Sequence, residues 1–335
     1  MRPIEEQVIV ITGGSSGIGR ATALEAVRRG ARVAITARGQ EALESARREI
    51  EAAGGPGSVL AVPADVADFE QVRELCRRAV ERFGRIDTWV NNASVSIYAE
   101  FAQITPPEFQ QVLNVNVMGV VHGAMVALEQ MKSQEGGGTI VNIASGLGDR
   151  AVPLQSPYSM AKFAVDGFSE ALRVELERGD IPVQVTVIKP SSINTPFFRN
   201  ARTKMGVKAR PLPPVYEPEL VAEAILYAAV HPVRELQVGS PAVLMSLQQV
   251  APRLMDWPLR RLGYAGQQSE TPKAETDRDN LFEGAPGPGA IHGEWRARRF
   301  SAATWLSLHP VVRRAALGGV AAFAGLALAR RNGVV

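Results

Sequence analysis

Thr12-Gly-Gly-Ser-Ser-Gly-Ile-Gly19 directly follows the apolar run Val8–Thr12 and leads into a segment near 17–29 whose apolar residues recur with helical spacing. A strand, a glycine-rich turn and a helix in this order are typical of a dinucleotide-binding unit, although glycines also serve ordinary turns. Glycine allows a close backbone approach to a pyrophosphate, and the free N–H groups at a helix start attract phosphates. The predicted cofactor contacts here are Gly13, Ser15, Ser16, Gly17, Ile18 and Gly19.

Strand and helix patterns alternate along the first 240 residues. Short runs that are apolar at nearly every position are typical of strands buried on both faces. The runs after the first are Arg32–Ala37, Ser58–Val62, Thr88–Asn91, Thr139–Ala144 and Val183–Ile188, with a last strand expected near Glu235–Val238. Helical periodicity recurs near 17–29, 40–53, 68–83, 106–133, 157–178 and 217–230. This alternation predicts a Rossmann-type doubly wound parallel β-sheet flanked by helices, in a single main domain over residues 1–240.

Residues 241–335 are expected to form a C-terminal extension with helical segments, a polar loop and a basic, apolar tail. Residues 241–262 are helical in character, with breaks at Pro252 and Pro258, and residues 265–293 are polar and loop-like.

The final uncharged run, residues 315–329, lies between two arginine pairs. It is shorter than the ~20 residues that a helix needs to span a bilayer. One interpretation is peripheral membrane contact through residues 294–335. The other, which the length favours, is a helix that packs on the protein or on a partner subunit.

Composition limits the function classes. Cys76 is the single cysteine, which excludes internal disulfides and suits a reducing, cytoplasmic setting. The four histidines show no ligand spacing, so no metal is expected. The net charge of +3 reflects seven arginines after Trp295, with no acidic residue among them. Because this basicity belongs to the tail and not to a nucleic-acid reader, no nucleic acid is expected. The N-terminal apolar run is too short for a signal peptide.

The end of the second strand indicates the cofactor. An enzyme that binds NAD by its ribose hydroxyls usually has an acidic residue there, but the chain reads Ile35-Thr-Ala-Arg38. Arg38 could instead form charge-assisted hydrogen bonds to a 2′-phosphate. The alternative is an arginine in a solvated loop. We therefore expect NADP(H) in preference to NAD(H).

Tyr158 and Lys162 are the candidate catalytic pair. They are four residues apart on a predicted helix and so share one face. A nearby ammonium lowers the pKa of a phenol, which suits a general acid or base in carbonyl reduction. Ser145 follows a strand at the carboxyl edge, where open α/β sheets bind ligands, and could polarise a substrate carbonyl. An exposed helix pair is the alternative for Tyr158 and Lys162.

Together these pieces resemble the short-chain dehydrogenase/reductase superfamily, over roughly residues 5–240. The matching pieces are Thr12-Gly-x-x-x-Gly-x-Gly19, Asp65-Val66, Asn91-Asn-Ala93, Asn116, Ser145 and Tyr158-x-x-x-Lys162. The chain departs from the family pattern at Ser94 and Ser191, where the family usually has glycine. Both departures fall near the expected nicotinamide pocket.

The resemblance implies an oxidoreductase that interconverts a carbonyl and an alcohol, with Tyr158, Lys162, Ser145 and Asn116 as catalytic residues. It implies that Lys162 holds the nicotinamide ribose and that Asn116, in preference to Asn114, keeps a water in a proton relay. Asn91 would steady the central sheet. The further cofactor contacts that it implies are Asp65, Val66, Asn92, Ala93, Tyr158, Lys162 and Thr195.

Substrate and assembly are less determined. Aromatic residues in Pro196–Asn200, together with Tyr98 and Phe101, suggest an apolar pocket for a small carbonyl or alcohol, followed by a stretch at Ala201–Pro214 that is expected to be mobile. The alternative is that these aromatic residues belong to the core, which has the same composition. The resemblance implies a homodimer or homotetramer through helices 106–133 and 157–178. A non-catalytic NADP(H) sensor and a membrane-associated scaffold are the rival functions. The presence of both Tyr158 and Lys162 weighs against the sensor.

Overall fold

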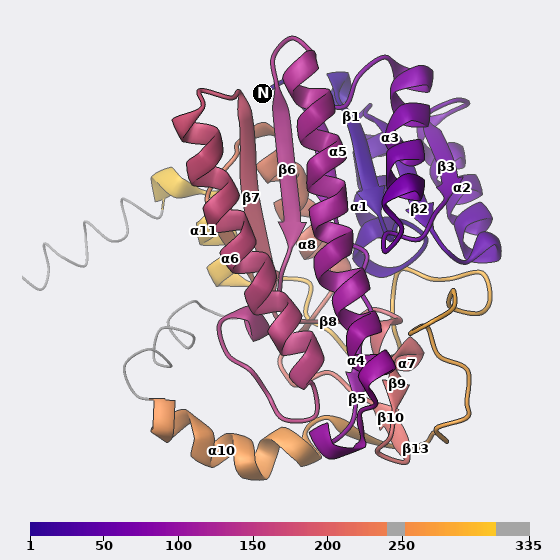
Figure 1. The fold of residues 1–335 in the computed structure, drawn as a ribbon, viewed down its shortest axis with the longest axis vertical. Helices are drawn as coiled ribbons and strands as arrows, with labels where there is room; N and C mark the ends of the chain where they lie inside the picture. The colour runs from indigo at the N-terminus through magenta and orange to yellow at the C-terminus, as the bar shows by residue number, and fades with distance from the viewer. Residues whose placement is uncertain (240–251, 313–335) are drawn as a thin grey trace, which may run out of the picture.

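The computed structural model describes residues 1–239 and 252–312, and its centre is a seven-stranded sheet (Figure 1). The strand order is β12-β7-β6-β4-β1-β2-β3, and every neighbouring pair is parallel. The strands are β1 (Val8–Thr12), β2 (Arg32–Ala37), β3 (Val59–Pro63), β4 (Thr88–Asn91), β6 (Gly138–Ile143), β7 (Val183–Pro190) and β12 (Glu235–Val238). The predicted doubly wound parallel sheet is therefore confirmed.

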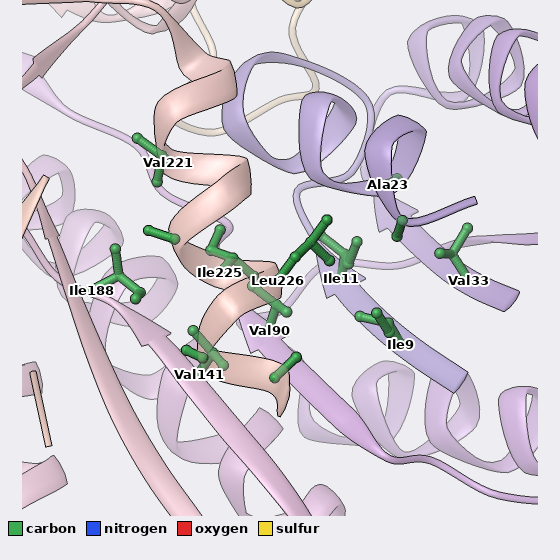
Figure 2. Close-up of a cluster of buried hydrophobic side chains, with 14 of the residues drawn as sticks. Ile9, Ile11, Ala23, Val33, Val90, Val141, Ile188, Val221, Ile225 and Leu226 are labelled. Carbon is green, nitrogen blue, oxygen red and sulfur yellow. The ribbon is translucent and has the colours of Figure 1, made fainter. Parts of the chain in front are cut away.

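Helices cover both faces of this sheet. They are α1 (Gly17–Arg28), α2 (Gln40–Gly54), α3 (Phe69–Phe83), α4 (Pro106–Leu113), α5 (Gly119–Ser133), α6 (Ser156–Arg178) and α8 (Pro218–Val230). Side chains of α1, α2 and α8 pack with Ile9 and Ile11 on one face, and those of α3, α5 and α6 pack with Val8 and Val10 on the other. Figure 2 shows α8 laying Val221, Ile225 and Leu226 over the sheet. Because strand side chains alternate between faces, a sheet covered twice requires apolar residues at successive positions.

Small elements surround the carboxyl edge of the sheet. They are β5 (Ile97–Tyr98), β8 (Ser192–Ile193), α7 (Phe197–Asn200), β9 (Arg202–Thr203), β10 (Val207–Ala209), β11 (Val215–Tyr216), α10 (Pro252–Ala265), β13 (Gln268–Pro272) and α11 (Ala302–Leu308). Short 3₁₀ turns lie at Ile4–Glu6, Phe101–Gln103 and Gly146–Gly148.

Three predicted elements differ in detail. The helix expected over 106–133 contains a π-helical turn, Asn114–Met118, between α4 and α5. The break expected at Pro258 is wrong, because α10 continues through it. An interior proline removes one helical hydrogen bond, yet the helix is continuous from Pro252 to Ala265 with Pro258 inside it. The region expected to be a loop after residue 265 contains β13, which pairs with β10.

The segment Pro106–Ser133 is the one helix among the described residues that is long and apolar enough to cross a membrane. Half of its most apolar window is buried inside the protein, as in the core helix of a globular domain. The tail run 315–329 lies outside the described residues, so its two interpretations stay predictions.

The described part of the extension packs on the main domain. Leu281 is fully buried with residues of α3 and α5, and Leu308 is buried with residues of α8. At α11, the Ser301 hydroxyl donates to the Gly239 carbonyl over 2.7 Å, and the Gly239 N–H donates to Thr304 Oγ1 over 2.8 Å. The extension is thus anchored in the apolar core on both faces of the sheet, by Leu308 on one face and Leu281 on the other.

Replacing Leu281 with alanine tests this anchoring. We expect the free energy of unfolding to fall by about 2–5 kcal/mol, because the change removes buried methyl groups and leaves a cavity. Denaturant unfolding measures the loss. Leu262→Ala is the matched control, since Leu262 is 67% exposed and such a change typically alters stability by less than about 0.5 kcal/mol. Equal stability of the two variants would contradict the anchoring.

Candidate active site

One long cavity of about 510 Å³ follows the carboxyl edge of the sheet. It reaches from Gly13 and Arg38, past Ser145 and Tyr158, to Phe197 and Leu259. Parallel α/β sheets bind ligands at this edge, because the loops after successive strands converge there. The cavity therefore brings most of the predicted cofactor and catalytic residues together, whereas Gly19 and Asn116 do not line it.

The glycine loop forms a cradle that no side chain could enter. Gly13 and Gly17 have φ values of +67° and +53°, a region that favours glycine. A Cβ at Gly19 would lie 2.3 Å from the Gly13 carbonyl oxygen. Because α1 begins at Gly17, its first N–H groups have no partner within the helix, although the Gly17 N–H donates to the Ala290 carbonyl over 2.9 Å. This narrow, positively polarised cradle fits a pyrophosphate.

The loop after β4 lies against the cradle. The Asn92 side-chain amide donates to the Thr12 carbonyl over 2.8 Å, and the backbone N–H groups of Asn92 and Ala93 donate to Thr12 Oγ1. Asn91 lies deeper and joins β4 to β6 through a 2.9 Å hydrogen bond from its amide to Asn142 Oδ1. Asn91 thus steadies the central sheet, as the family resemblance implied.

Arg38, Asp65 and Val66 line the end of the cavity nearest β2 and β3. The Arg38 guanidinium donates to the Asn280 carbonyl over 2.6 Å and to the Phe282 carbonyl over 3.2 Å. It also lies 3.7 Å from Asp65. Burial lowers the pKa of Arg38, an effect that Asp65 opposes. Arg38 is therefore not a solvated loop arginine, and the extension reaches the cofactor end of the cavity.

Tyr158, Ser145 and Ser94 bring three hydroxyl groups together on the cavity wall. Ser145 follows β6, and its Oγ accepts a hydrogen bond from the Leu147 N–H over 3.1 Å. Removal from water raises the pKa of Tyr158 to about 12, although hydrogen bonds with Ser145 and Ser94 lower it. Ser94, one of the two departures from the family pattern, thus adds a hydroxyl group to the predicted catalytic cluster.

Lys162 lies one helical turn from Tyr158, with its Nζ 5.3 Å from the centre of the phenol ring. It donates to the Ile143 carbonyl over 2.8 Å. Burial lowers the pKa of Lys162 to about 8, an effect that Asp166 opposes. The expected lowering of the Tyr158 pKa by this ammonium is not found, because the cost of burying a phenolate is larger.

Asn116 is fully buried in the π-helical turn. Its amide nitrogen donates to the Val95 carbonyl over 2.9 Å, and its Oδ1 accepts from the Val95 N–H and the Ser94 hydroxyl. The side chain therefore positions the loop beside Tyr158, and its role in a water relay stays a prediction. Asn114 faces outward, where it accepts from Gln110.

The far end of the cavity is largely apolar. Phe197 packs edge-on against Tyr158 with ring centres 5.6 Å apart, and Tyr98 lies beside Phe198. The expectation for Phe101 is wrong: its side chain is 71% exposed and packs on Phe109 outside the cavity. Phe101 belongs to a 3₁₀ turn that directs it away from the sheet edge.

Thr195 lies between the two ends, and its side chain would contact a Cβ placed at Gly17. Sequence reasoning missed several lining residues, because they come from distant segments without a motif. They are Gln155, Pro258, Leu259, Gln267, Asn280, Gly284 and Ala285.

Away from the cavity, Glu217, Glu219 and His292 offer ligand atoms within 4.8 Å of one another. Their side chains are partly or fully exposed, and His292 Nε2 lies 2.7 Å from Glu219 Oε1. The expectation of no metal stays a prediction.

Comparison with known proteins agrees with this geometry. A family model for short chain dehydrogenase matches residues 7–206. An uncharacterised oxidoreductase of Bacillus subtilis, YxnA, is 36% identical over 97% of this chain and 91% of its own length. The 3-ketodihydrosphingosine reductase of Bos taurus is 31% identical over 71% of this chain and 73% of its own length. The similarity to YxnA thus includes most of the extension.

Among solved structures, levodione reductase is 29% identical and covers 69% of this chain and 95% of its own, with a TM-score of 0.62. A dehydrogenase/reductase from Burkholderia phymatum in complex with NAD is 26% identical and covers 76% of this chain and 97% of its own, with a TM-score of 0.69. An alcohol dehydrogenase from Thermococcus sibiricus, complexed with 5-hydroxy-NADP, is 28% identical and covers 69% of this chain and 95% of its own, with a TM-score of 0.60. From the family match, the relatives and the shared fold, this chain belongs to the short-chain dehydrogenase family and is an oxidoreductase.

Proposed function

We propose that the protein is an NADP(H)-dependent oxidoreductase that interconverts a carbonyl group and an alcohol on a small apolar substrate. The observation that carries the proposal is one cavity in which Tyr158, Ser145 and Lys162 meet, continuous with the glycine cradle at one end and aromatic side chains at the other. The bound dinucleotide would supply or accept the hydride.

The chain's own residues would handle the proton and the substrate oxygen. Ser145 Oγ accepts from the Leu147 N–H and hydrogen-bonds with Tyr158, so the Ser145 hydroxyl would turn from the phenol to donate to a substrate carbonyl. In the reducing direction Tyr158 gives its proton to that oxygen, so that hydride and proton together yield the alcohol. Lys162, as an ammonium near the ring, stabilises the phenolate that remains.

The choice of NADP(H) rests on Arg38 at the end of β2, in the place where an NAD enzyme usually has an acidic residue. A guanidinium has five N–H donors, and Arg38 gives three hydrogen bonds to the carbonyls of Asn280, Leu281 and Phe282, which leaves two donors for a 2′-phosphate. The related structures include complexes with NAD and with an NADP derivative. They do not favour either cofactor, so the proposal of NADP(H) rests on Arg38.

A turnover assay tests the proposal. Absorbance of the reduced nicotinamide would be followed with NADPH or NADH across apolar aldehydes, cyclic diketones and long-chain 3-ketones. The last two classes are chosen because levodione reductase and 3-ketodihydrosphingosine reductase are among the relatives. Turnover of a carbonyl with NADPH is the expected result. Tight dinucleotide binding without turnover of any class would favour the non-catalytic sensor instead.

The pH dependence of carbonyl reduction should follow the protonation state of Lys162. With its pKa lowered to about 8, Lys162 is an ammonium below that pH and neutral above it. We therefore expect kcat/KM to be constant below about pH 8 and to fall as the pH rises further. Asp166→Asn should move this break to lower pH, because the negative charge of Asp166 raises the pKa of Lys162. Glu170→Gln, an exposed carboxylate paired with Arg234, is the control. An unmoved break in Asp166→Asn would contradict the assignment.

We also propose a homodimer or homotetramer in the cytoplasm. Helices α5 and α6 expose large apolar side chains, among them Met125, Met160, Phe163 and Val174. Exposed apolar surface on neighbouring helices is typical of a subunit interface. Peripheral membrane contact through residues 294–335 is the alternative for the tail.

A further inference from the structure

Residues 279–293, called here the cover segment, belong to the long loop between β13 and α11 (Figure 1) and reach the cofactor end of the cavity. Asn280, Gly284 and Ala285 line the cavity itself. Gly284 lies so close to Gly39 that a Cβ would be 2.6 Å from the Gly39 nitrogen. The cover segment is thus a wall of the predicted cofactor site, contributed by a part of the chain far from the glycine loop.

The cover segment then runs along the glycine loop. The Gly17 N–H, at the start of α1, donates to the Ala290 carbonyl over 2.9 Å. Arg20 donates to the Pro288 carbonyl over 3.0 Å, and a Cβ at Gly289 would lie 2.7 Å from the Ser15 carbonyl oxygen. The cover segment therefore contacts the glycine loop through its backbone and takes up the N–H group of Gly17 at the start of α1.

Both ends of the cover segment are fixed. At the first end, Asp279 pairs with Arg202 over 2.8 Å, and Leu281 is buried in the core. At the second end, His292 contacts Glu219 over 2.7 Å, and the Gly293 N–H donates to the Asn194 carbonyl over 3.1 Å. The middle, Gly284-Ala-Pro-Gly-Pro-Gly289, contains no charged side chain to hold it. A segment fixed at both ends can lift at its middle without leaving the domain, once the hydrogen bonds from Arg20 and Gly17 to the Pro288 and Ala290 carbonyls break.

Arg38 links the cover segment to the cofactor end. Its guanidinium donates to the carbonyls of Asn280 and Phe282 and lies at the end of β2, where the adenosine ribose of a dinucleotide is bound in this fold. An anionic 2′-phosphate at Arg38 would lie directly beside the cover segment. The Arg38 side chain would therefore both bind the 2′-phosphate and hold the cover segment closed.

We propose that the cover segment is part of the cofactor site and encloses the adenosine half of the dinucleotide, so that cofactor exchange requires it to lift. This inference rests on the proposed function, because it takes a nicotinamide dinucleotide as the ligand. Closing segments of this kind often set the rate of ligand release. The extension is thus a determinant of how long the cofactor stays bound.

Gly284→Ala tests the proposal in the full-length protein. The added methyl would collide with Gly39 backbone and hold the segment away from Arg38. We expect NADPH dissociation, measured by stopped-flow fluorescence in a displacement experiment, to accelerate at least about tenfold. Gly287→Asn is the matched control: its φ of +79° is tolerated by asparagine, and a Cβ there meets nothing within 4 Å. The control should release NADPH at the wild-type rate.

Two further measurements complete the test. Hydrogen exchange of residues 284–293 should slow when NADPH binds to wild type, and less so in Gly284→Ala. Asp279→Asn, which weakens the pairing with Arg202 without adding volume, should accelerate dissociation in the same direction even if Gly284→Ala folds poorly. NADPH binding with unchanged exchange and unchanged dissociation in both variants would overturn the cover segment alone. Absence of binding to wild type by both NADPH and NADH would overturn the proposed function as well.

Discussion

Tyr158→Phe should lower kcat/KM for carbonyl reduction by about two to four orders of magnitude, the usual contribution of a general acid. The substitution removes only the hydroxyl group, so the packing of the ring against Phe197 is kept. The phenol has a pKa of about 12 in this site, which keeps it protonated and able to donate at neutral pH. Steady-state kinetics with the best substrate of the panel would measure the loss.

The control for this prediction is Tyr98→Phe. Tyr98 lies on the same cavity and is fully buried, but the hydroxyl cluster beside Ser145 is formed by Tyr158. Its loss should change kcat/KM by less than about tenfold, since it supplies no proton. NADPH affinity should be similar in both variants. Comparable turnover by Tyr158→Phe and wild type would show that another group is the acid.

Arg38→Asp should reduce the preference for NADPH over NADH, expressed as the ratio of the two kcat/KM values, by at least about 100-fold. A hydrogen bond to a charged group contributes about 1.5–3 kcal/mol, and two such bonds to a phosphate would account for a change of this size. The introduced carboxylate also repels a 2′-phosphate and can accept from the ribose hydroxyls of NADH.

Because Arg38 also holds the cover segment, the test is the ratio of kcat/KM for NADPH to kcat/KM for NADH, and not the affinity for either cofactor alone. Loosening of the segment weakens both cofactors alike, whereas loss of the phosphate contact weakens NADPH alone. Asp279→Asn loosens the segment but keeps the Arg38 guanidinium in place, so it should change the ratio far less than Arg38→Asp does. If Arg38→Asp also leaves the ratio unchanged, Arg38 serves the cover segment and does not select the cofactor.

Local patterns predicted much of this molecule. The seven strands of the sheet lie within a few residues of their predicted positions, because a strand buried on both faces must be apolar throughout. Tyr158 and Lys162 could be paired from their spacing alone, since residues four apart share a helix face. Glu108 accepts from the Thr105 N–H, an interaction between residues three apart at the start of a helix. In each case the decisive interaction is between near neighbours in the chain.

Features that depend on contacts between distant segments were decided only by the tertiary structure. The Tyr158 pKa is raised and not lowered, because burial depends on everything packed around the ring. Phe101 is aromatic like Phe197 and Phe198 but lies outside the cavity. The residue type alone does not tell which way a side chain points. The contact of Arg38 with Asn280 joins residues 242 positions apart, and no periodicity or motif connects them. The sequence by itself determined the sheet, the glycine cradle and the Tyr158–Lys162 pair, because local sterics and spacing specify these. Only the folded chain placed the extension over the cofactor end, because Arg20 and Arg38 bond there to backbone carbonyls, which every residue carries.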